Sequence, residues 1–143
     1  MSPDAPRDIL HASSVAVDGR GVLIRGAAGS GKSTLALALL ALGGVLIADD
    51  RTVVALRDGR PWLSAPDTIR GRIEARGIGI LNAGAITEAP LALVVDMDRG
   101  PPARLPEPET IPVFGHHVEV ISGQQGGHFP AALRHYLLYG RSD

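Results

Sequence analysis

Short apolar runs separated by turn residues organise this chain, and they predict a succession of strands. Two pairs of runs each surround a glycine-containing turn and predict strands that lie side by side: residues 14–17 with 22–25, and residues 51–56 with 61–64. Three further runs predict single buried strands: residues 45–48, 91–95 and 118–121. We expect residues 1–9 to form a loose arm, because they show no periodicity and contain two prolines.

Two segments predict helices. Residues 34–42 are rich in Ala and Leu and end at Gly43-Gly44, and residues 130–139 begin with a proline and end before Gly140. The first helix is apolar nearly all round, so we expect it to be covered on several sides. Either the chain's own sheet and C-terminal helix cover it, which we favour, or a partner subunit does. Residues 66–84 give no clear assignment, and residues 98–112, with five prolines, predict a loop.

Composition narrows the functional classes. The 143 residues suit one domain, which we place at residues 10–143. A net charge of −1 argues against nucleic acid and anionic membranes as partners, and the absence of cysteine excludes disulfides and thiolate chemistry. The longest apolar stretch, residues 34–48, is too short to span a membrane, and the N-terminus carries no secretion signal. We therefore expect a soluble cytoplasmic α/β protein.

The glycine-rich segment 26–33 is the most specific signal in the chain. Gly26-x-x-x-x-Gly31-Lys32-Ser33 matches the Walker A pattern, with an apolar strand before it and a helix after it. Glycines let backbone N–H groups surround phosphate oxygens, and the helix N-terminus adds partial positive charge. Lys32, the only lysine, would contact the β- and γ-phosphates, and the Ser33 hydroxyl would ligate Mg²⁺. The predicted nucleotide-binding residues are Gly26, Ala27, Ala28, Gly29, Ser30, Gly31, Lys32, Ser33 and Thr34.

Carboxylates at strand ends are candidates for metal binding and proton transfer. Asp49-Asp50 follow the strand at 45–48, and Asp96 follows the strand at 91–95, so either could face the phosphates. Neighbouring residues at a strand end point to opposite sides. One aspartate of the pair can therefore face the metal or the nucleophile while the other is tethered, and an aspartate beside an acceptor hydroxyl can take its proton. Glu74 and Arg76 precede two glycines: Glu74 could complete a metal shell and Arg76 could hold a phosphate. A solvated charged loop explains these residues equally well.

Four segments in this order and spacing resemble the C-terminal catalytic domain of the HPr serine kinase/phosphorylase family: His11-Ala12, residues 26–33, residues 46–50, and residues 73–79. The resemblance implies a P-loop-containing kinase domain with a mixed sheet, a P-loop helix and a C-terminal helix. It also implies ATP and Mg²⁺ as cofactors and an HPr-like phosphocarrier protein as the partner. In the family, a serine of HPr is phosphorylated, and inorganic phosphate reverses the reaction with release of pyrophosphate. A homo-oligomer, a hexamer in the family, is implied as well.

Carried over by position, the resemblance makes Asp50 the proton acceptor of the kinase reaction and the proton donor of its reverse, assisted by His11. Lys32 becomes the phosphate-contacting lysine. The remaining positions are Ser33 and Glu74 for Mg²⁺, with Asp49 as a further metal candidate, and Arg76 in the second family motif.

Two departures from the family pattern bear on these expectations. Only about ten residues precede His11, which is similar to short alphaproteobacterial versions. The family's C-terminal catalytic arginine aligns with residues 114–117, Phe-Gly-His-His, so phosphorolysis is the reaction most affected by its loss. Arg99 or Arg104 could substitute. A P-loop phosphotransferase on a small molecule and a nucleotide-binding regulator with weak turnover are the alternative functions.

Overall fold

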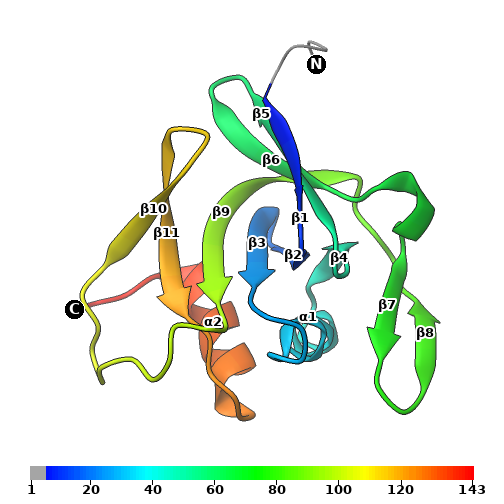
Figure 1. Cartoon of the computed structure of the whole chain (residues 1–143). Helices are drawn as coiled ribbons and strands as arrows, with labels where there is room; N and C mark the ends of the chain where they lie inside the picture. Colours follow the sequence, from blue (N-terminus) through cyan, green and yellow to red (C-terminus); the bar gives the residue numbers. More distant parts are fainter. Residues whose placement is uncertain (1–5) are drawn as a thin grey trace.

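The computed structural model describes residues 6–143, which fold as a mixed α/β structure with two helices on one large sheet (Figure 1). The elements in chain order are β1 Arg7–Leu10, β2 Ala12–Val17, β3 Arg20–Arg25, α1 Lys32–Ala41, β4 Val45–Ala48, β5 Thr52–Arg57, β6 Arg60–Ser64, a 3-10 turn at Asp67–Ile69, β7 Arg72–Ala75, β8 Gly79–Asn82, β9 Glu88–Asp96, β10 Glu109–Val113, β11 His116–Ser122 and α2 His128–Tyr139. Neither helix is long and apolar enough to cross a membrane, within the described part of the chain.

The nine-stranded sheet is mixed and branches at β9. Its main path runs β1-β5-β6-β9-β3-β2-β4, while β11 also pairs with β9 and carries β10. The first residues of β9 pair antiparallel with β6, and the later ones pair parallel with both β3 and β11. Arg25 and Ser122 both lie opposite Asp96 in this register. The carboxyl ends of β3, β9 and β11 therefore meet at one edge of the sheet, the edge at which α/β proteins bind ligands.

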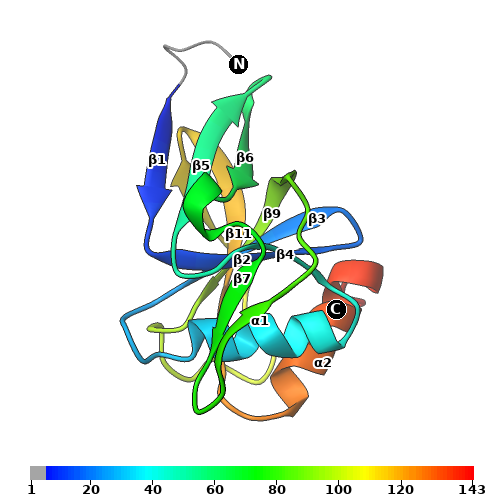
Figure 2. The ribbon, with the colours of Figure 1, turned by 90° about the vertical axis from the view of Figure 1, so that its right-hand side faces the viewer.

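The helix α1 is covered by the chain's own elements. It packs on β2, β3 and β4, with α2 on one side and β7 on the other (Figure 1). Leu35, Ala36 and Leu39 are buried in the cluster that α1 and α2 form with the sheet. Figure 2 shows both helices at the end of the molecule opposite the β5–β6 hairpin. The first of the two alternatives for covering this apolar helix is confirmed.

The structure corrects two expectations about elements and assigns one segment that the sequence left open. Arg7–Leu10 form β1 on β5, so residues 7–9 are not a loose arm, while residues 1–5 of that arm lie outside the described residues. Residues 72–82 form the separate β7–β8 pair. The proline-rich loop ends at residue 108, because Glu109–Val113 form β10. Pro112 is tolerated there since β10 is an edge strand, paired only with β11.

Candidate active site

The loop between β3 and α1 has the backbone geometry of a phosphate-binding loop. Gly26, Gly29 and Gly31 take φ values of +155°, +82° and +101°, which L side chains rarely adopt. A Cβ added at Gly26 would lie 2.6 Å from the Ser30 hydroxyl oxygen, so no larger residue fits the turn as it stands. The loop leads directly into the N-terminus of α1, where free N–H groups and the helix dipole favour an anion.

The Lys32 side chain lies inside this loop and bonds to its backbone. Its Nζ donates to the carbonyl oxygens of Gly26 at 2.8 Å and Ala27 at 3.1 Å, and the residue is only 8% exposed. An ammonium group is therefore held at the centre of the loop by neutral acceptors, and no carboxylate among residues 6–143 bonds to it. Such a charge is available to the oxygens of a phosphate chain.

Asp49 is the hydrogen-bonded centre of the site. Its Oδ1 accepts from the hydroxyls of Ser33 at 2.7 Å and Ser13 at 2.9 Å, and its Oδ2 accepts from the Glu74 backbone N–H at 2.9 Å. The residue is 9% exposed, and three donors compensate its burial. Asp49 therefore ties β2, α1 and β7 together and orients the Ser33 hydroxyl.

Asp50 faces the opposite way because of a tight turn. Its φ is +66°, a left-handed conformation that Asp and Asn adopt more readily than most residues. The Arg51 N–H donates to the Asp49 carbonyl at 2.7 Å, and the Asp50 N–H donates to the Ser13 hydroxyl at 3.1 Å. This turn leaves Asp50 exposed, with its side chain lining the cavity beside the P-loop.

The strand β7 brings two more charged side chains to that cavity. Ile73 and Ala75 are buried toward α1, so the alternation of the strand turns Glu74 outward. Arg76 follows in the β7–β8 turn. The cavity measures about 300 Å³, and its lining is predominantly polar. The residues that line it are Ala28, Gly29, Gly31, Lys32, Ser33, Thr34, Asp50, Glu74 and Arg76.

His11 lies near this cavity without lining it. It occupies the exposed bend between β1 and β2, directly before Ala12, whose Cα pairs with Arg25 at the end of β3. His11 therefore sits at the same edge of the sheet as Asp50, outside the set of cavity-lining residues.

Asp96 is the less suitable of the two metal candidates. Its Oδ2 pairs with Arg25 at 3.1 Å and with Arg99 at 3.7 Å, and its Oδ1 accepts from the Asp98 N–H. Arg99 also pairs with Glu109, and Arg104 lines a different groove. Among the described residues, Arg76 is thus the one arginine lining the P-loop cavity.

The segment 114–117 does not reach the P-loop of its own chain. It lies at the turn between β10 and β11, where β11 begins, whereas the carboxyl end of β11 is level with the end of β3. In Figure 1 this turn is at the top and the P-loop is at the bottom. Within one chain these residues therefore lie at the opposite end of β11 from the P-loop edge, and their alignment with the family's catalytic arginine stays a prediction.

Two residues that sequence reasoning missed contact the P-loop directly. Asp98 accepts a hydrogen bond from the Ala27 N–H at 2.9 Å, and the Gln125 side-chain amide donates to the Ser30 carbonyl at 2.9 Å. Asp98 follows β9, which pairs parallel with β3, and Gln125 follows β11, which pairs parallel with β9. The signal that could have found them is their position after strands predicted at 91–95 and 118–121, combined with the rule that such ends meet.

The oxygen donors beside the P-loop fit magnesium. Ser33 donates its proton to Asp49, which leaves its oxygen lone pairs free, and the Glu74 carboxylate lines the same cavity. Mg²⁺ commonly takes only one or two protein oxygens and completes its shell with phosphates and waters. Within residues 6–143 no three His, Asp or Glu side chains gather as a metal cage.

Fold and motif together define an α/β protein with a Walker A loop at the carboxyl edge of a mixed sheet. Residues 4–89 match the HPr Serine kinase C-terminal domain, and the chain belongs to this family. The HPr kinase/phosphorylase of Limosilactobacillus reuteri (strain DSM 20016) is 45% identical over 83 residues, which cover 57% of this chain and 26% of that protein. The HPr kinase/phosphorylase of Geobacillus kaustophilus is 40% identical over 108 residues, which cover 70% of this chain and 35% of that protein.

A solved structure supports the fold over nearly the whole chain. The Hpr(Ser) kinase/phosphatase from Coxiella burnetii superposes with a TM-score of 0.79 at 25% identity, covering 92% of this chain and 88% of that one. By contrast, the chain spans about a quarter to a third of the length of the curated relatives named above.

Proposed function

We propose that this protein is an ATP-dependent serine kinase that acts on HPr or an HPr-like phosphocarrier. The observation that carries the proposal is the shared cavity, in which Lys32 and Ser33 of the P-loop lie with the exposed carboxylate of Asp50. Family membership supports ATP use, and the names of the relatives support HPr as the acceptor.

The P-loop binds and polarises the phosphates in this mechanism. Backbone N–H groups between Gly26 and Ser33 and the Lys32 ammonium hold the β- and γ-phosphates. Asp49 keeps the Ser33 hydroxyl turned toward the metal position, where Ser33 and Glu74 would hold Mg²⁺. When bound, Mg²⁺ neutralises phosphate charge. Arg76 adds a permanent positive charge at the cavity rim.

Asp50 supplies the proton chemistry. The acceptor serine oxygen attacks the γ-phosphorus, the bond to the ADP oxygen breaks, and Asp50 takes the hydroxyl proton. In the reverse direction inorganic phosphate attacks phosphoserine, pyrophosphate forms, and Asp50 returns a proton to the serine oxygen. One aspartate serves both directions because a base in one direction is an acid in the other. His11, at the same edge of the sheet, is proposed to assist this step.

The proposal is tested with labelled ATP, Mg²⁺ and purified HPr. We expect one phosphoserine on HPr from the native chain and none from Asp50→Asn, although Asp50→Asn still binds ATP. If HPr stays unlabelled while a small-molecule acceptor becomes labelled, the phosphotransferase alternative replaces this proposal. If the protein binds ATP without turning it over, a nucleotide-binding regulator is favoured. The hexamer and the cytoplasmic location stay predictions, of which sedimentation velocity tests the first.

A further inference from the structure

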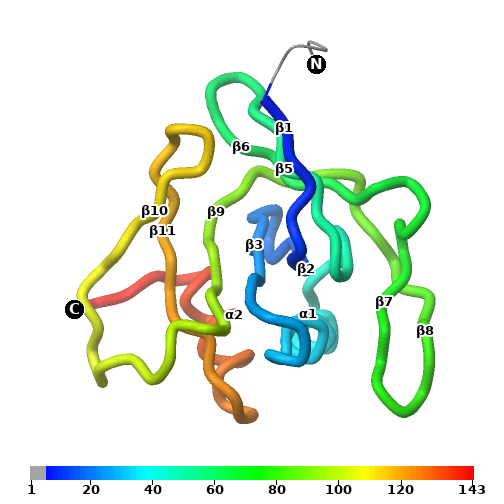
Figure 3. The backbone as a smooth tube through the Cα atoms, in the orientation of Figure 1, coloured from blue at the N-terminus to red at the C-terminus, as the bar shows by residue number. Residues whose placement is uncertain are grey.

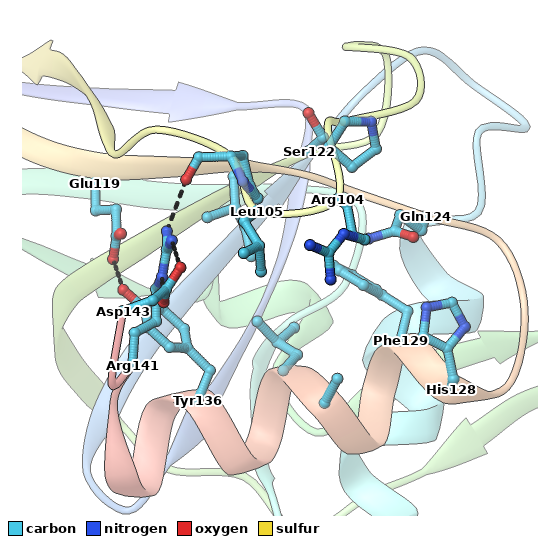
Figure 4. Close-up of a pocket in the computed structure, with 15 residues that line it drawn as sticks. Arg104, Leu105, Glu119, Ser122, Gln124, His128, Phe129, Tyr136, Arg141 and Asp143 are labelled. Atoms are coloured by element: carbon cyan, nitrogen blue, oxygen red, sulfur yellow. Dashed lines mark hydrogen bonds and ion pairs between the residues drawn. The ribbon is translucent and has the colours of Figure 1, made fainter.

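A second and larger hollow lies on the other side of the P-loop from the acidic cavity. It is a groove of about 350 Å³ between α2, β11 and the proline-rich segment before β10 (Figure 4). Its size falls within the ~300–1,000 Å³ typical of ligand sites, and its walls are predominantly apolar. Those walls are formed by Pro102, Leu105, Ile121, Phe129, Ala132 and Leu133.

The two ends of the groove differ in chemistry. Figure 4 shows Arg104, Gln124 and His128 together at one end. At the other end the Tyr136 hydroxyl donates a hydrogen bond to the Glu119 carboxylate. Arg141 donates to the Pro106 carbonyl and so holds the C-terminal segment against the proline-rich loop. Figure 3 shows this C-terminal segment ending beside the excursion between β9 and β10. The open polar end therefore offers donors, and the far end is closed by internal bonds.

The polar end of the groove lies next to the P-loop. Gln124 lines the groove, and its neighbour Gln125 donates to the Ser30 carbonyl of the P-loop at 2.9 Å. A Cβ at Gly31 would lie 3.2 Å from the Gln125 amide nitrogen, so this loop rests directly on the phosphate-binding turn. A ligand that is bound to the P-loop and extends past Gln125 would enter the groove at its donor-rich end.

The topology gives that ligand its direction. Asp50, Glu74 and Arg76 follow β4 or belong to β7 and its turn, on one side of α1. The strands β9 and β11 and the helix α2 lie on the other side (Figure 1). When an extended triphosphate points its γ-phosphate toward the acidic cavity, its α-phosphate points away from that cavity, toward the side of β9 and β11. A nucleoside attached there comes to the side on which the groove lies.

We propose that this groove is the nucleoside subsite for ATP, an inference that rests on the proposed kinase function. The flat base lies on the apolar wall around Leu105 and Phe129. Gln124 offers one donor and one acceptor to the base edge, and Arg104 and His128 face the ribose and the α-phosphate. The groove thus contributes nucleotide affinity and no proton transfer.

A bulky substitution at an exposed groove position separates nucleoside from phosphate binding. Ala132 is exposed on α2 and lines the groove, whereas its neighbour Ala131 is also exposed and does not line it. Ala132→Trp and the matched control Ala131→Trp are titrated calorimetrically with MgATP and with magnesium tripolyphosphate, which lacks the nucleoside. We expect Ala132→Trp to lower the affinity for MgATP about tenfold or more and the affinity for tripolyphosphate less than about twofold. Ala131→Trp should leave both affinities unchanged.

Each other outcome overturns a defined part of the reasoning. Unchanged MgATP affinity in Ala132→Trp would show that the groove does not hold the nucleoside. Equal weakening of both ligands would show that Ala132→Trp acts on phosphate binding, and it would overturn the assignment of the groove to the nucleoside. If the native chain binds both ligands yet leaves HPr unlabelled, the kinase proposal fails while the nucleoside subsite stands. If the native chain binds neither ligand, both proposals fail.

Discussion

Replacing Asp49 by Asn tests whether the buried aspartate holds the site together. The carboxylate has two oxygens that accept from three donors, the hydroxyls of Ser13 and Ser33 and the backbone N–H of Glu74. An amide has one oxygen and one NH₂ group. With the NH₂ group toward the Glu74 N–H, two donors face each other. In the reverse orientation the two serine hydroxyls must turn to accept from the NH₂ group, and the proton of the buried Ser13 hydroxyl loses its acceptor.

The size of the effect follows from this count. An unsatisfied buried donor costs ~1–3 kcal/mol, so we expect Asp49→Asn to lower the free energy of unfolding by that amount. For a domain of this size each kcal/mol corresponds to about 3–4 °C, which places the loss of Tm at about 3–12 °C. The assay is urea and thermal unfolding of the protein without ligand, so that loss of metal or nucleotide binding does not enter.

Asp50→Asn is the matched control. Its side chain is exposed and accepts no hydrogen bond from any residue the structure describes, and Asn tolerates the +66° φ at least as well as Asp. We expect its unfolding free energy to stay within about 0.5 kcal/mol of the native value while phosphoryl transfer is lost. Equal destabilisation of the two variants, or a neutral Asp49→Asn, would refute the division of roles between the two aspartates.

Three further predictions concern other parts of the molecule. Lys32→Ala should lower the affinity for ATP, measured by calorimetry, at least about a hundredfold, because it removes the positive charge inside the phosphate-binding loop. Gly26→Ala should destabilise the protein by ~1–3 kcal/mol through its strained φ, whereas Gly84→Ala, where a Cβ has open space, should be neutral in urea unfolding. Burial and the bond to Glu119 raise the pKa of Tyr136 from 10.0 to about 12, so the folded state keeps a proton that the unfolded state loses, and stability falls as pH rises through that range. Tyr136→Phe should reduce this fall, measured by urea unfolding from pH 9 to 12.

Elements with strong local signals were predictable from the sequence. The Walker pattern with its flanking strand and helix, the strands on either side of tight turns, and the C-terminal helix all appear where the residue pattern places them. The edge strands β1 and β10 were not predicted because their residues are mostly exposed or interrupted by proline, and their pairing partners supply the order. The β7–β8 pair was missed for a related reason, since burial of Ile73 depends on α1.

The candidate site divides in the same way. The residues in recognisable motifs, Lys32, Ser33, Asp50 and Glu74, converge on one cavity. The contacts of Ser13, Asp98 and Gln125 with the site are tertiary. The antiparallel pairing of β2 with β4 brings Ser13 to Asp49, and the parallel pairing of β9 with β3 and β11 brings Asp98 and Gln125 to the P-loop. No local pattern marks them. Which aspartate of the pair turns inward was also open, because it depends on one left-handed residue.

The hydrogen bond from Gln125 to the Ser30 carbonyl joins residues 95 positions apart, which has a consequence for biosynthesis. A ribosome adding about 5–20 residues per second needs about 5–19 seconds to pass from one partner to the other. During that interval the nascent chain carries a complete Walker motif without the β9 and β11 neighbours that buttress it. Premature termination after the family-matching segment would therefore yield a polypeptide with the diagnostic motif and an unfinished nucleotide pocket.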